Sequence, residues 1–512
     1  MKPTIFFLIN SVDIKRGGLT RASLKQASLF AEMGFKTYMI TFNFNPDYPL
    51  IRHQLYEMNK IHKNVIIRNM YEELEGHRKP LIKSFPKKTK SLVEWTEGYP
   101  YDKRGGHNAY RVYKNGAYYK YISLNEHNLV NFIDYFNENR YRTKRVDYDL
   151  WGNIKKVSYM DFIHNKPRQL IYYNNKGEAY FTQWNNPETN EVERIILFNK
   201  DSTFKKAYIN DNVLHKVDWL TEIIDQENKK SIVVSDTRST DEVLVKLKHP
   251  NAAKIWRLHS NHVKAPYKLD SEIADAVQTG FNHIKKFDAA VVLTQEQKQD
   301  IMNRTEVAGN LKVIPHYHET NDNMFTSLFG RTKVDQKKAV IVSRLSTLKR
   351  IDHAIKAFKI VTEKIPDARL EIWGEGTQTA NLKKLIKKLD LQKNVFLKGY
   401  THTPDAVYKK GLFSILTSKS EGFALSVLES MYNQTPVISY SIRYGPTDMI
   451  NNGKNGLLVK NGDIESLAEK MIYMFKNPDK AQDMGKKASK FVNKYFSKKY
   501  YKKCWLDVIN SL

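Results

Sequence analysis

Cysteine is almost absent from the 512-residue chain, which contains a single one, Cys504. One cysteine cannot build an intramolecular disulfide framework, and this usage fits a reducing compartment such as the cytoplasm. The sequence also contains no Cys/His spacing typical of a zinc site. We therefore expect a cytoplasmic protein without a structural metal.

Long apolar runs are missing as well. Residues 3–10 contain only a short apolar run, and no small-residue cleavage site follows it. Such a segment is typical of a buried β-strand rather than of a signal peptide. No stretch reaches the roughly 20 apolar residues that a membrane-spanning helix needs. The sequence thus predicts neither a secretion signal nor a membrane span.

Acidic residues are few relative to basic ones. The chain has 55 Asp and Glu against 83 Lys and Arg, which gives a formal net charge of +28. A field of this sign attracts polyanions, namely nucleic acid, anionic lipid surfaces or a polymer of phosphodiesters. The alternative is a generally basic protein with solvated lysines. No nucleic-acid-binding module is recognisable, so we expect no nucleic-acid partner. The partners that we still consider for this charge are an anionic polymer and, through peripheral attachment, the inner face of the membrane.

The chain opens with the pattern of a doubly wound α/β sheet. A strand at 3–10 precedes a turn at Gly17-Gly18, a helix from Thr20 and a second strand at Thr37–Phe42. A strand, a glycine-rich turn and a helix in this order are typical of the first unit of a parallel sheet. The same texture returns later, with short buried strands at 231–235, 253–259, 289–294 and 311–316.

The composition and the hydrophobic pattern of the sequence change between these two stretches. A basic segment punctuated by proline, residues 77–90, leads into a tyrosine-rich region of short alternating runs. Turn signals such as Asn115-Gly116 separate the runs. Alternation at period two between Asn-Gly-type turns predicts antiparallel hairpins, and hence an all-β insertion.

A second α/β series follows a polar segment, about 317–336, which we interpret as a linker. Its strands alternate regularly with helices rich in Lys, Leu and Ala, which indicates another doubly wound domain. The last fifty residues are helical in pattern and strongly basic. The expected domains are an N-terminal Rossmann-like domain (1–78 and 215–325), an inserted antiparallel β domain (79–214), a C-terminal Rossmann-like domain (326–490) and a C-terminal helix that packs back on the N-terminal domain (491–512).

The run from Ser420 to Glu429 carries the most specific chemical signal. Glu421 is expected in a loop after a strand, and Glu429 about two helical turns into the following helix. The backbone N–H groups of residues 423–426 would then lie at a helix N-terminus, where they can bind a diphosphate. Two carboxylates around a Gly-Phe pair at the end of a parallel strand are more specific than a surface charge.

Two cations upstream fit the same interpretation. Arg344 and Lys349 lie five residues apart in a segment expected to run from a strand through a loop to a helix. From there both can reach one diphosphate, with charge-assisted hydrogen bonds worth roughly 1.5–3 kcal/mol each. The alternative is a solvated basic loop.

These motifs resemble those of the retaining glycosyltransferases of family 4, which have the two-Rossmann-domain fold called GT-B. Glu421 to Glu429 is similar to the family's E-x7-E motif. The segment from Val342 to Asp352 is similar to its phosphate-binding G-R-L-x-x-x-K-G pattern, except that Arg350 stands where the family has glycine. The resemblance implies that Glu421 contacts the hydroxyls of the donor sugar and that Glu429 holds the ribose of the nucleotide.

The resemblance also implies roles for further residues. His259 matches the family's cleft histidine, whose role is contact with the donor sugar or the reacting centre, and His262 is its rival. Gly17 and Gly18 resemble the N-terminal glycine loop that faces the donor phosphates, although alone they could form a simple turn. The remaining donor-binding residues implied are Gly399 and Tyr400 near the base, and Gly422, Phe423, Ala424 and Leu425 at the diphosphate.

The mechanism that the resemblance implies is retaining transfer on one face of the sugar, with the leaving phosphate helping to deprotonate the acceptor hydroxyl. The catalytic residues are then Glu421, His259, Arg344 and Lys349. No Asp-x-Asp triplet stands at a plausible strand end, so cations and helix-terminal amides could stabilise the leaving diphosphate in place of a metal. No cofactor and no metal are therefore expected, and the donor is a UDP-sugar by resemblance.

The inserted β region narrows the resemblance to poly(glycerol-phosphate) α-glucosyltransferases and related wall teichoic acid α-glycosyltransferases of Gram-positive bacteria. It implies a homo-oligomer, commonly a trimer, formed through the insertion, although a purely structural insertion is the alternative. The expected substrates are UDP-glucose or UDP-N-acetylglucosamine and an anionic polyol-phosphate polymer, glycerol or ribitol phosphate. The alternative acceptor is a serine-rich or Ser-Asp-repeat surface protein.

Overall fold

The computed structural model describes residues 2–14, 18–76, 90–307, 309–318 and 333–512. The chain divides into two compact units, Met1–Lys254 and Ile255–Leu512, and each is described by itself. Gly17, nearly all of the basic segment 77–90 and most of the predicted linker 317–336 lie outside the described residues. The domain boundaries expected from the sequence stay a prediction.

The first unit contains four parallel strands in the order β14-β1-β2-β3. Every residue of β1 is buried, as expected for a central strand covered by helices on both faces. The strands are β1 (Thr4–Ile9), β2 (Thr37–Thr41), β3 (Val65–Asn69) and β14 (Ser231–Ser235), and the helices are α1 (Gly18–Glu32), α2 (Tyr48–Glu57), α3 (Met70–Leu74), α5 (Leu214–Asp225) and α6 (Asp241–Lys246).

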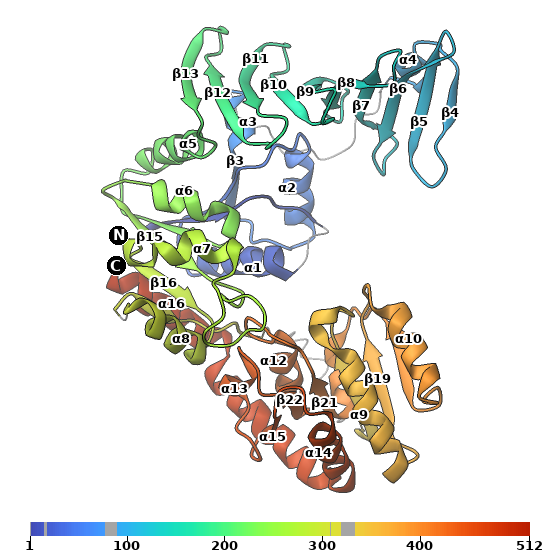
Figure 1. Cartoon of the computed structure of the whole chain (residues 1–512). Helices are drawn as coiled ribbons and strands as arrows, with labels where there is room; N and C mark the ends of the chain where they lie inside the picture. The colour runs from blue at the N-terminus through green and yellow to red at the C-terminus, as the bar shows by residue number, and fades with distance from the viewer. Residues whose placement is uncertain (1, 15–17, 77–89, 308, 319–332) are drawn as a thin grey trace. The chain divides into compact units, whose positions relative to one another are not determined.

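A ten-stranded antiparallel sheet, β4 to β13, interrupts this series between β3 and β14. Its strands are neighbours in chain order, so successive hairpins build the whole sheet (Figure 1). The short helix α4 (Leu92–Thr96) precedes it. The strands are β4 (Tyr101–Lys103), β5 (Ala109–Lys114), β6 (Ala117–Leu124), β7 (Val130–Phe136), β8 (Arg142–Tyr148), β9 (Ile154–Met160), β10 (Pro167–Tyr173), β11 (Ala179–Asn185), β12 (Val192–Phe198) and β13 (Phe204–Ile209).

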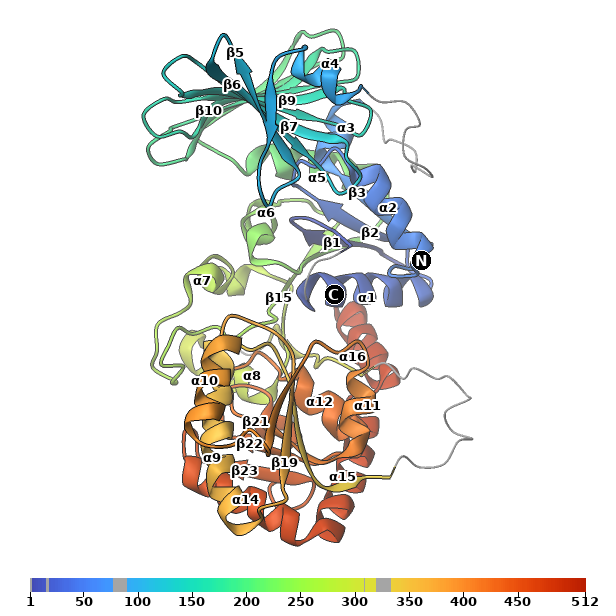
Figure 2. The same ribbon diagram turned by 90° about the vertical axis from the view of Figure 1, so that its right-hand side faces the viewer.

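The second unit contains the parallel strands β15, β16 and β17 and a six-stranded parallel sheet in the order β20-β19-β18-β21-β22-β23. In Figure 2 helices α9 and α10 lie on one side of the six-stranded sheet and α11 and α12 on the other. The strands are β15 (Ala252–Arg257), β16 (Ala289–Val292), β17 (Leu311–Val313), β18 (Asp335–Val342), β19 (Arg369–Trp373), β20 (Val395–Gly399), β21 (Gly411–Leu416), β22 (Val437–Tyr440) and β23 (Gly456–Val459).

The second unit also contains helices α7 to α16, the last of which form the basic C-terminal part of the chain. They are α7 (Asp275–Asn282), α8 (Gln295–Thr305), α9 (Ile351–Lys364), α10 (Thr379–Lys388), α11 (Pro404–Lys410), α12 (Leu425–Tyr432), α13 (Pro446–Met449), α14 (Ile464–Lys476), α15 (Pro478–Tyr495) and α16 (Lys498–Ser511). The last of them contacts β15, because Arg257 donates a hydrogen bond of 3.0 Å to the hydroxyl of Tyr501.

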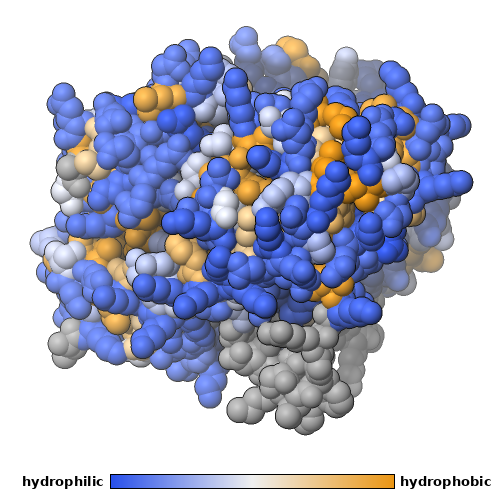
Figure 3. All heavy atoms as spheres, turned by 90° about the horizontal axis from the view of Figure 1, so that it is seen from below, coloured by the Kyte–Doolittle hydropathy of each residue, from blue (hydrophilic) through white to orange (hydrophobic). Residues whose placement is uncertain are grey.

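The predicted fold class is confirmed: parallel α/β sheets with an all-β insertion in the first of them. The predicted strand at 311–316 is shorter in the structure, where β17 ends at Val313. On the face shown in Figure 3, hydrophilic side chains predominate over scattered apolar ones. None of the helices within the described ranges has the length and apolarity to cross a bilayer.

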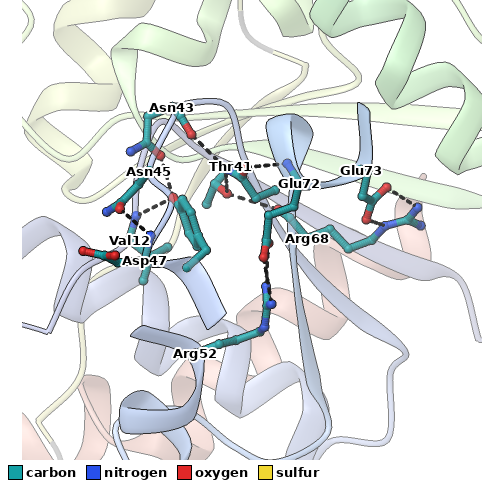
Figure 4. A network of polar contacts seen from close by, with 11 residues as sticks. Val12, Thr41, Asn43, Asn45, Asp47, Arg52, Arg68, Glu72 and Glu73 are labelled. Carbon is teal, nitrogen blue, oxygen red and sulfur yellow. Dashed lines mark hydrogen bonds and ion pairs between the residues drawn. The ribbon is translucent and has the colours of Figure 1, made fainter. Parts of the chain in front are cut away.

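A buried ion pair joins α2 to α3 in the first unit (Figure 4). Two nitrogens of Arg52 lie 2.8 and 3.1 Å from the carboxylate oxygens of Glu72. The two side chains are only 1% and 5% exposed. Because both charges have left water, each depends on the other for compensation.

We expect Arg52→Met to lower the free energy of unfolding by about 3–5 kcal/mol, because it leaves the Glu72 carboxylate buried without its partner. Urea unfolding followed by circular dichroism measures the loss. Arg369→Met, which removes an arginine from the half-exposed pair with Asp335, is the control and should cost no more than about 1 kcal/mol. Equal losses in the two variants would contradict the importance of the buried pair.

Candidate functional site

The loops that carry the predicted site residues follow adjacent strands. Strands β18 and β21 pair in parallel at the centre of the six-stranded sheet, so their carboxyl ends meet at one edge. The loop after β18 contains Arg344 and Lys349, and the loop after β21 contains Glu421. In open α/β sheets this edge is where ligands bind.

Lys349 and Glu421 contact each other directly. The Lys349 Nζ lies 2.5 Å from Oε1 of Glu421, and the Ser418 hydroxyl donates to the same oxygen at 2.6 Å. Both charged side chains are mostly buried, with 16% and 13% exposed. A small cavity lined by Ser343, Lys349, Ser418 and Ser426 lies beside them. The structure thus joins two groups that the sequence placed only in separate motifs.

Arg344 lies at the start of the same loop and is exposed. Within the described ranges its guanidinium makes neither an ion pair nor a side-chain hydrogen bond. The turn after β19 supports the loop closely, since a Cβ on Gly374 would lie 1.9 Å from the carbonyl oxygen of Ser343. Only glycine therefore fits there. The backbone that presents Arg344 is fixed while its side chain stays exposed to solvent.

Helix α12 begins at Leu425, after Ala424 in the left-handed conformation (φ 65°). Glu429 is therefore the fifth residue of the helix, just over one turn in, rather than two turns as the sequence predicted. Leu425 and Ser426 supply first-turn N–H groups, which an α-helix leaves without intrahelical acceptors. Glu429 is partly buried on this helix.

The segment after β15 lies against the loop of Glu421. A Cβ on Gly422 would come within 2.2 Å of the carbonyl oxygen of His259, so the two backbones are in close contact. The His259 ring stacks on His316 with 5.5 Å between centroids, and His316 meets Phe423 edge-on at 5.4 Å. The structure therefore brings His259, Gly422 and Phe423 together with the Lys349–Glu421 pair.

The other predicted residues lie at neighbouring positions. Gly399 ends β20 with φ +77°, and its carbonyl accepts a 2.7 Å hydrogen bond from the N–H of Gly374. Tyr400 follows it and is 58% exposed. Gly18 is the first residue of α1, in the first unit. The predicted approach of this glycine turn to a donor stays a prediction.

His262, the rival of His259, is fully buried. Its ring lies between those of Phe281 and Tyr444, with centroids 5.9 and 5.8 Å away. Burial lowers the pKa of His262 to about 4, and the charge of Arg304 adds to the shift. A neutral imidazole packed between two aromatic rings suits a packing role, and the assignment of the cleft histidine to His259 stays a prediction.

The sequence interpretation missed the residues that hold the Glu421 loop from behind. The backbone of Glu421 pairs with Arg443 and Tyr444, at 3.1 and 2.8 Å. The side chains of both residues in turn donate to Asp300 of α8, at 2.6 and 2.7 Å. Neither pair has a spacing that marks a motif, because the partners are more than 140 residues apart.

No cluster of three or more His, Cys, Asp or Glu side chains arranged to hold a metal occurs in the part of the chain that the structure describes. Of the residues that the sequence motifs predicted, the charged ones at this edge are Arg344, Lys349 and Glu421, and the first turn of α12 begins beside them. Such a set can bind a diphosphate next to a hydroxyl-bearing group.

The burial of His262 predicts a pH dependence of stability. The unfolded histidine, with a pKa near 6.5, binds a proton in a range where the folded one stays neutral until about pH 4. The unfolded state then holds more protons between these values, so stability is lost as the pH falls through the window. The charged side chains that act on His262 are those of Arg304, Asp300 and Arg443.

We expect His262→Phe to flatten this pH dependence, by at most about 1.4 kcal/mol per pH unit. Urea unfolding of wild type and variant at several values between pH 6.5 and 4 measures the difference. Parallel profiles for the two proteins would contradict a neutral, buried His262.

Comparisons with known proteins agree with this geometry. Residues 328–491, which include the loops after β18 and β21, match the family described as Glycosyl transferases group 1. The chain is 27% identical to the poly(glycerol-phosphate) alpha-glucosyltransferase of Bacillus subtilis (strain 168) over 99% of this chain and 75% of that protein. It is 26% identical to the poly(ribitol-phosphate) alpha-N-acetylglucosaminyltransferase of Staphylococcus aureus (strain COL) over 99% of each.

The fold is similar along the whole chain to a solved structure. Over 100% of both chains it matches the crystal structure of a mutant of S. aureus TarM in complex with fondaparinux, alpha-GlcNAc-glycerol and UDP, with a TM-score of 0.79 and 24% identity. The GT-B fold expected from the sequence is thereby confirmed. The chain thus has the GT-B fold with an antiparallel insertion, and it resembles the family 4 glycosyltransferases, in particular the wall teichoic acid α-glycosyltransferases.

Proposed function

We propose that the chain is a retaining glycosyltransferase that moves glucose or N-acetylglucosamine from a UDP-sugar, in α-linkage, to the polyol-phosphate chain of wall teichoic acid. The observation that carries the proposal is the Lys349–Glu421 pair, held at the carboxyl ends of two adjacent strands. Relatives that align with 99% of this chain carry the names of enzymes that act on poly(glycerol-phosphate) and poly(ribitol-phosphate).

In this proposal the donor lies along the edge from Arg344 to Glu421. Arg344, Lys349 and the first turn of α12 bind the diphosphate, and they gain strength as charge develops on the leaving group. Glu421 accepts hydrogen bonds from the sugar hydroxyls. Glu429 holds the ribose, and Gly399 and Tyr400 contact the base through their backbone.

Because Lys349 touches Glu421, the diphosphate and the sugar of one donor would meet a single pair of side chains. The ammonium can hold the Glu421 carboxylate in place while it contacts the phosphate. The carbonyl of His259 abuts Gly422, and in this proposal the His259 ring contacts the sugar end of the donor. The leaving phosphate then helps to deprotonate the acceptor hydroxyl on the same face.

We assign the acceptor from the net positive charge of the chain. A polymer with a phosphate at every unit suits a chain of net charge +28, through many weak contacts along its length. The same charge suits peripheral attachment to the anionic inner face of the membrane. Self-association through the antiparallel insertion, as a trimer, and a cytoplasmic location complete the proposal.

A radiolabelled-sugar transfer assay tests the function. UDP-glucose and UDP-N-acetylglucosamine are each offered with purified glycerol- or ribitol-phosphate teichoic acid, or with a Ser-Asp-repeat protein, in EDTA. Label on teichoic acid supports the proposal and identifies the sugar. Label on the protein alone would move the enzyme to the alternative acceptor, and label on neither would contradict the proposal.

Glu421→Gln should lower the turnover number at least about a hundredfold, because it removes the charge proposed to act on the sugar, while UDP affinity changes little. The assay above and calorimetric UDP titration measure the two effects. Glu363→Gln, an exposed glutamate on α9, is the matched control. Near-wild-type turnover in Glu421→Gln would remove Glu421 from the site.

Lys349→Ala should weaken UDP binding about tenfold or more, because a charge-assisted contact to the diphosphate is lost. Titration of UDP into each protein measures the change. Lys383→Ala, an exposed lysine on α10, should bind UDP like the wild type. Unchanged UDP affinity in Lys349→Ala would argue against this phosphate site.

A further inference from the structure

Arg350 occupies a backbone position that favours glycine. It lies between the loop of Lys349 and helix α9, with φ 45° and ψ 44°, in the left-handed region. A residue with a Cβ is sterically disfavoured there, whereas glycine is not. The family pattern has glycine at this place. Some gain from the arginine side chain must therefore offset the steric cost.

The guanidinium of Arg350 makes contacts that glycine could not. It donates to the carbonyl oxygens of Thr417 (2.9 Å) and Ser418 (2.7 Å), the first two residues after β21. It also donates to the side chain of Asn461 and lies 4.9 Å above the ring of Tyr440. A planar fork of fixed donors suits two neighbouring carbonyls better than a lysine would.

These bonds belong to a set that ties the two site loops together. The N–H of Lys419 donates to the Leu348 carbonyl (2.8 Å), and the Thr417 hydroxyl to the Lys349 carbonyl (2.9 Å). Ser418, whose carbonyl Arg350 holds, donates its hydroxyl to Glu421 at 2.6 Å. A continuous path of hydrogen bonds thus runs from the arginine through one residue to the carboxylate.

We propose that Arg350 is a positioning residue: it fixes the loop of residues 417–421 and so orients Glu421 toward the sugar of the donor. This inference rests on the proposed function for its consequence in binding. Its structural part, the fixing of the loop, is independent of which donor is used. Arg350 itself touches neither the sugar nor the diphosphate in this proposal.

The first test measures the loop. In Arg350→Gly, which keeps the backbone conformation without steric cost, amide hydrogen exchange should become about tenfold or more faster in peptides that cover 417–421. Exchange in α9 and the urea midpoint should stay close to wild type. Arg350→Lys should give the same direction of change. Unchanged exchange at 417–421 in both variants would overturn the proposal.

The second test separates the sugar from the diphosphate. Arg350→Gly should bind UDP within about twofold of the wild type, while the affinity for the UDP-sugar and the turnover number fall about tenfold. Equal loss of affinity for UDP and UDP-sugar would overturn the positioning role, because a distorted phosphate loop explains it. Arg369→Ala, at the opposite end of β19 from the site loops, is the control and should change neither.

A third variant checks that the path runs through Ser418. If it does, Ser418→Ala and Arg350→Gly lower turnover less in combination than the product of their separate effects predicts. Independent, multiplying effects would overturn the path. If the wild type transfers no sugar but exchange at 417–421 still rises in Arg350→Gly, the proposed function fails and the positioning of the loop by Arg350 stands.

Discussion

The parallel pairing of β18 with β21 is the constraint on which the site depends. These strands are separated by 68 residues, from Val342 to Gly411, yet they are neighbours in the sheet. Parallel pairing requires both strands to end at the same edge, so the loops that follow them must meet. The contact between Lys349 and Glu421 is a consequence of that meeting. The side chains need only be long enough to close the remaining distance.

Much of the fold could be predicted because its signals are local. Short apolar strands alternating with amphipathic helices indicated the parallel sheets, and Asn-Gly turns between tyrosine-rich runs indicated the hairpins. The site motifs were equally local: Glu421 and Glu429, or Arg344 and Lys349, lie within one strand–loop–helix segment. What escaped prediction links distant segments. Arg350 reaches the carbonyl of Thr417, 67 residues away, and Arg443 reaches Asp300, 143 residues away.

Two details that the sequence does not show have the same origin in backbone conformation. The first turn of α12 was expected from residues 423–426, but the left-handed Ala424 delays the helix to Leu425. Arg350, also left-handed, was noticed only as a departure from the family's glycine. An unfavourable φ at a residue with a side chain is invisible in a sequence pattern. It becomes informative when the structure shows what the side chain gains in return.

The insertion is part of the first unit's packing rather than an appended module. Phe181 and Tyr172 of the antiparallel sheet pack with Phe44, Tyr71 and Leu74, which belong to the α/β part of the same unit. Tyr71 and Tyr172 stack with 4.9 Å between ring centroids.

A buried ion pair crosses the same boundary, since Lys155 lies 2.5 Å from Glu75 with side chains 1% and 4% exposed. Removing the insertion would expose Phe44, Tyr71 and Leu74 to water, which carries a cost, and would take away the lysine that pairs with Glu75. Any acceptor-binding or self-associating surface on the sheet is therefore held in a fixed orientation to the first α/β sheet.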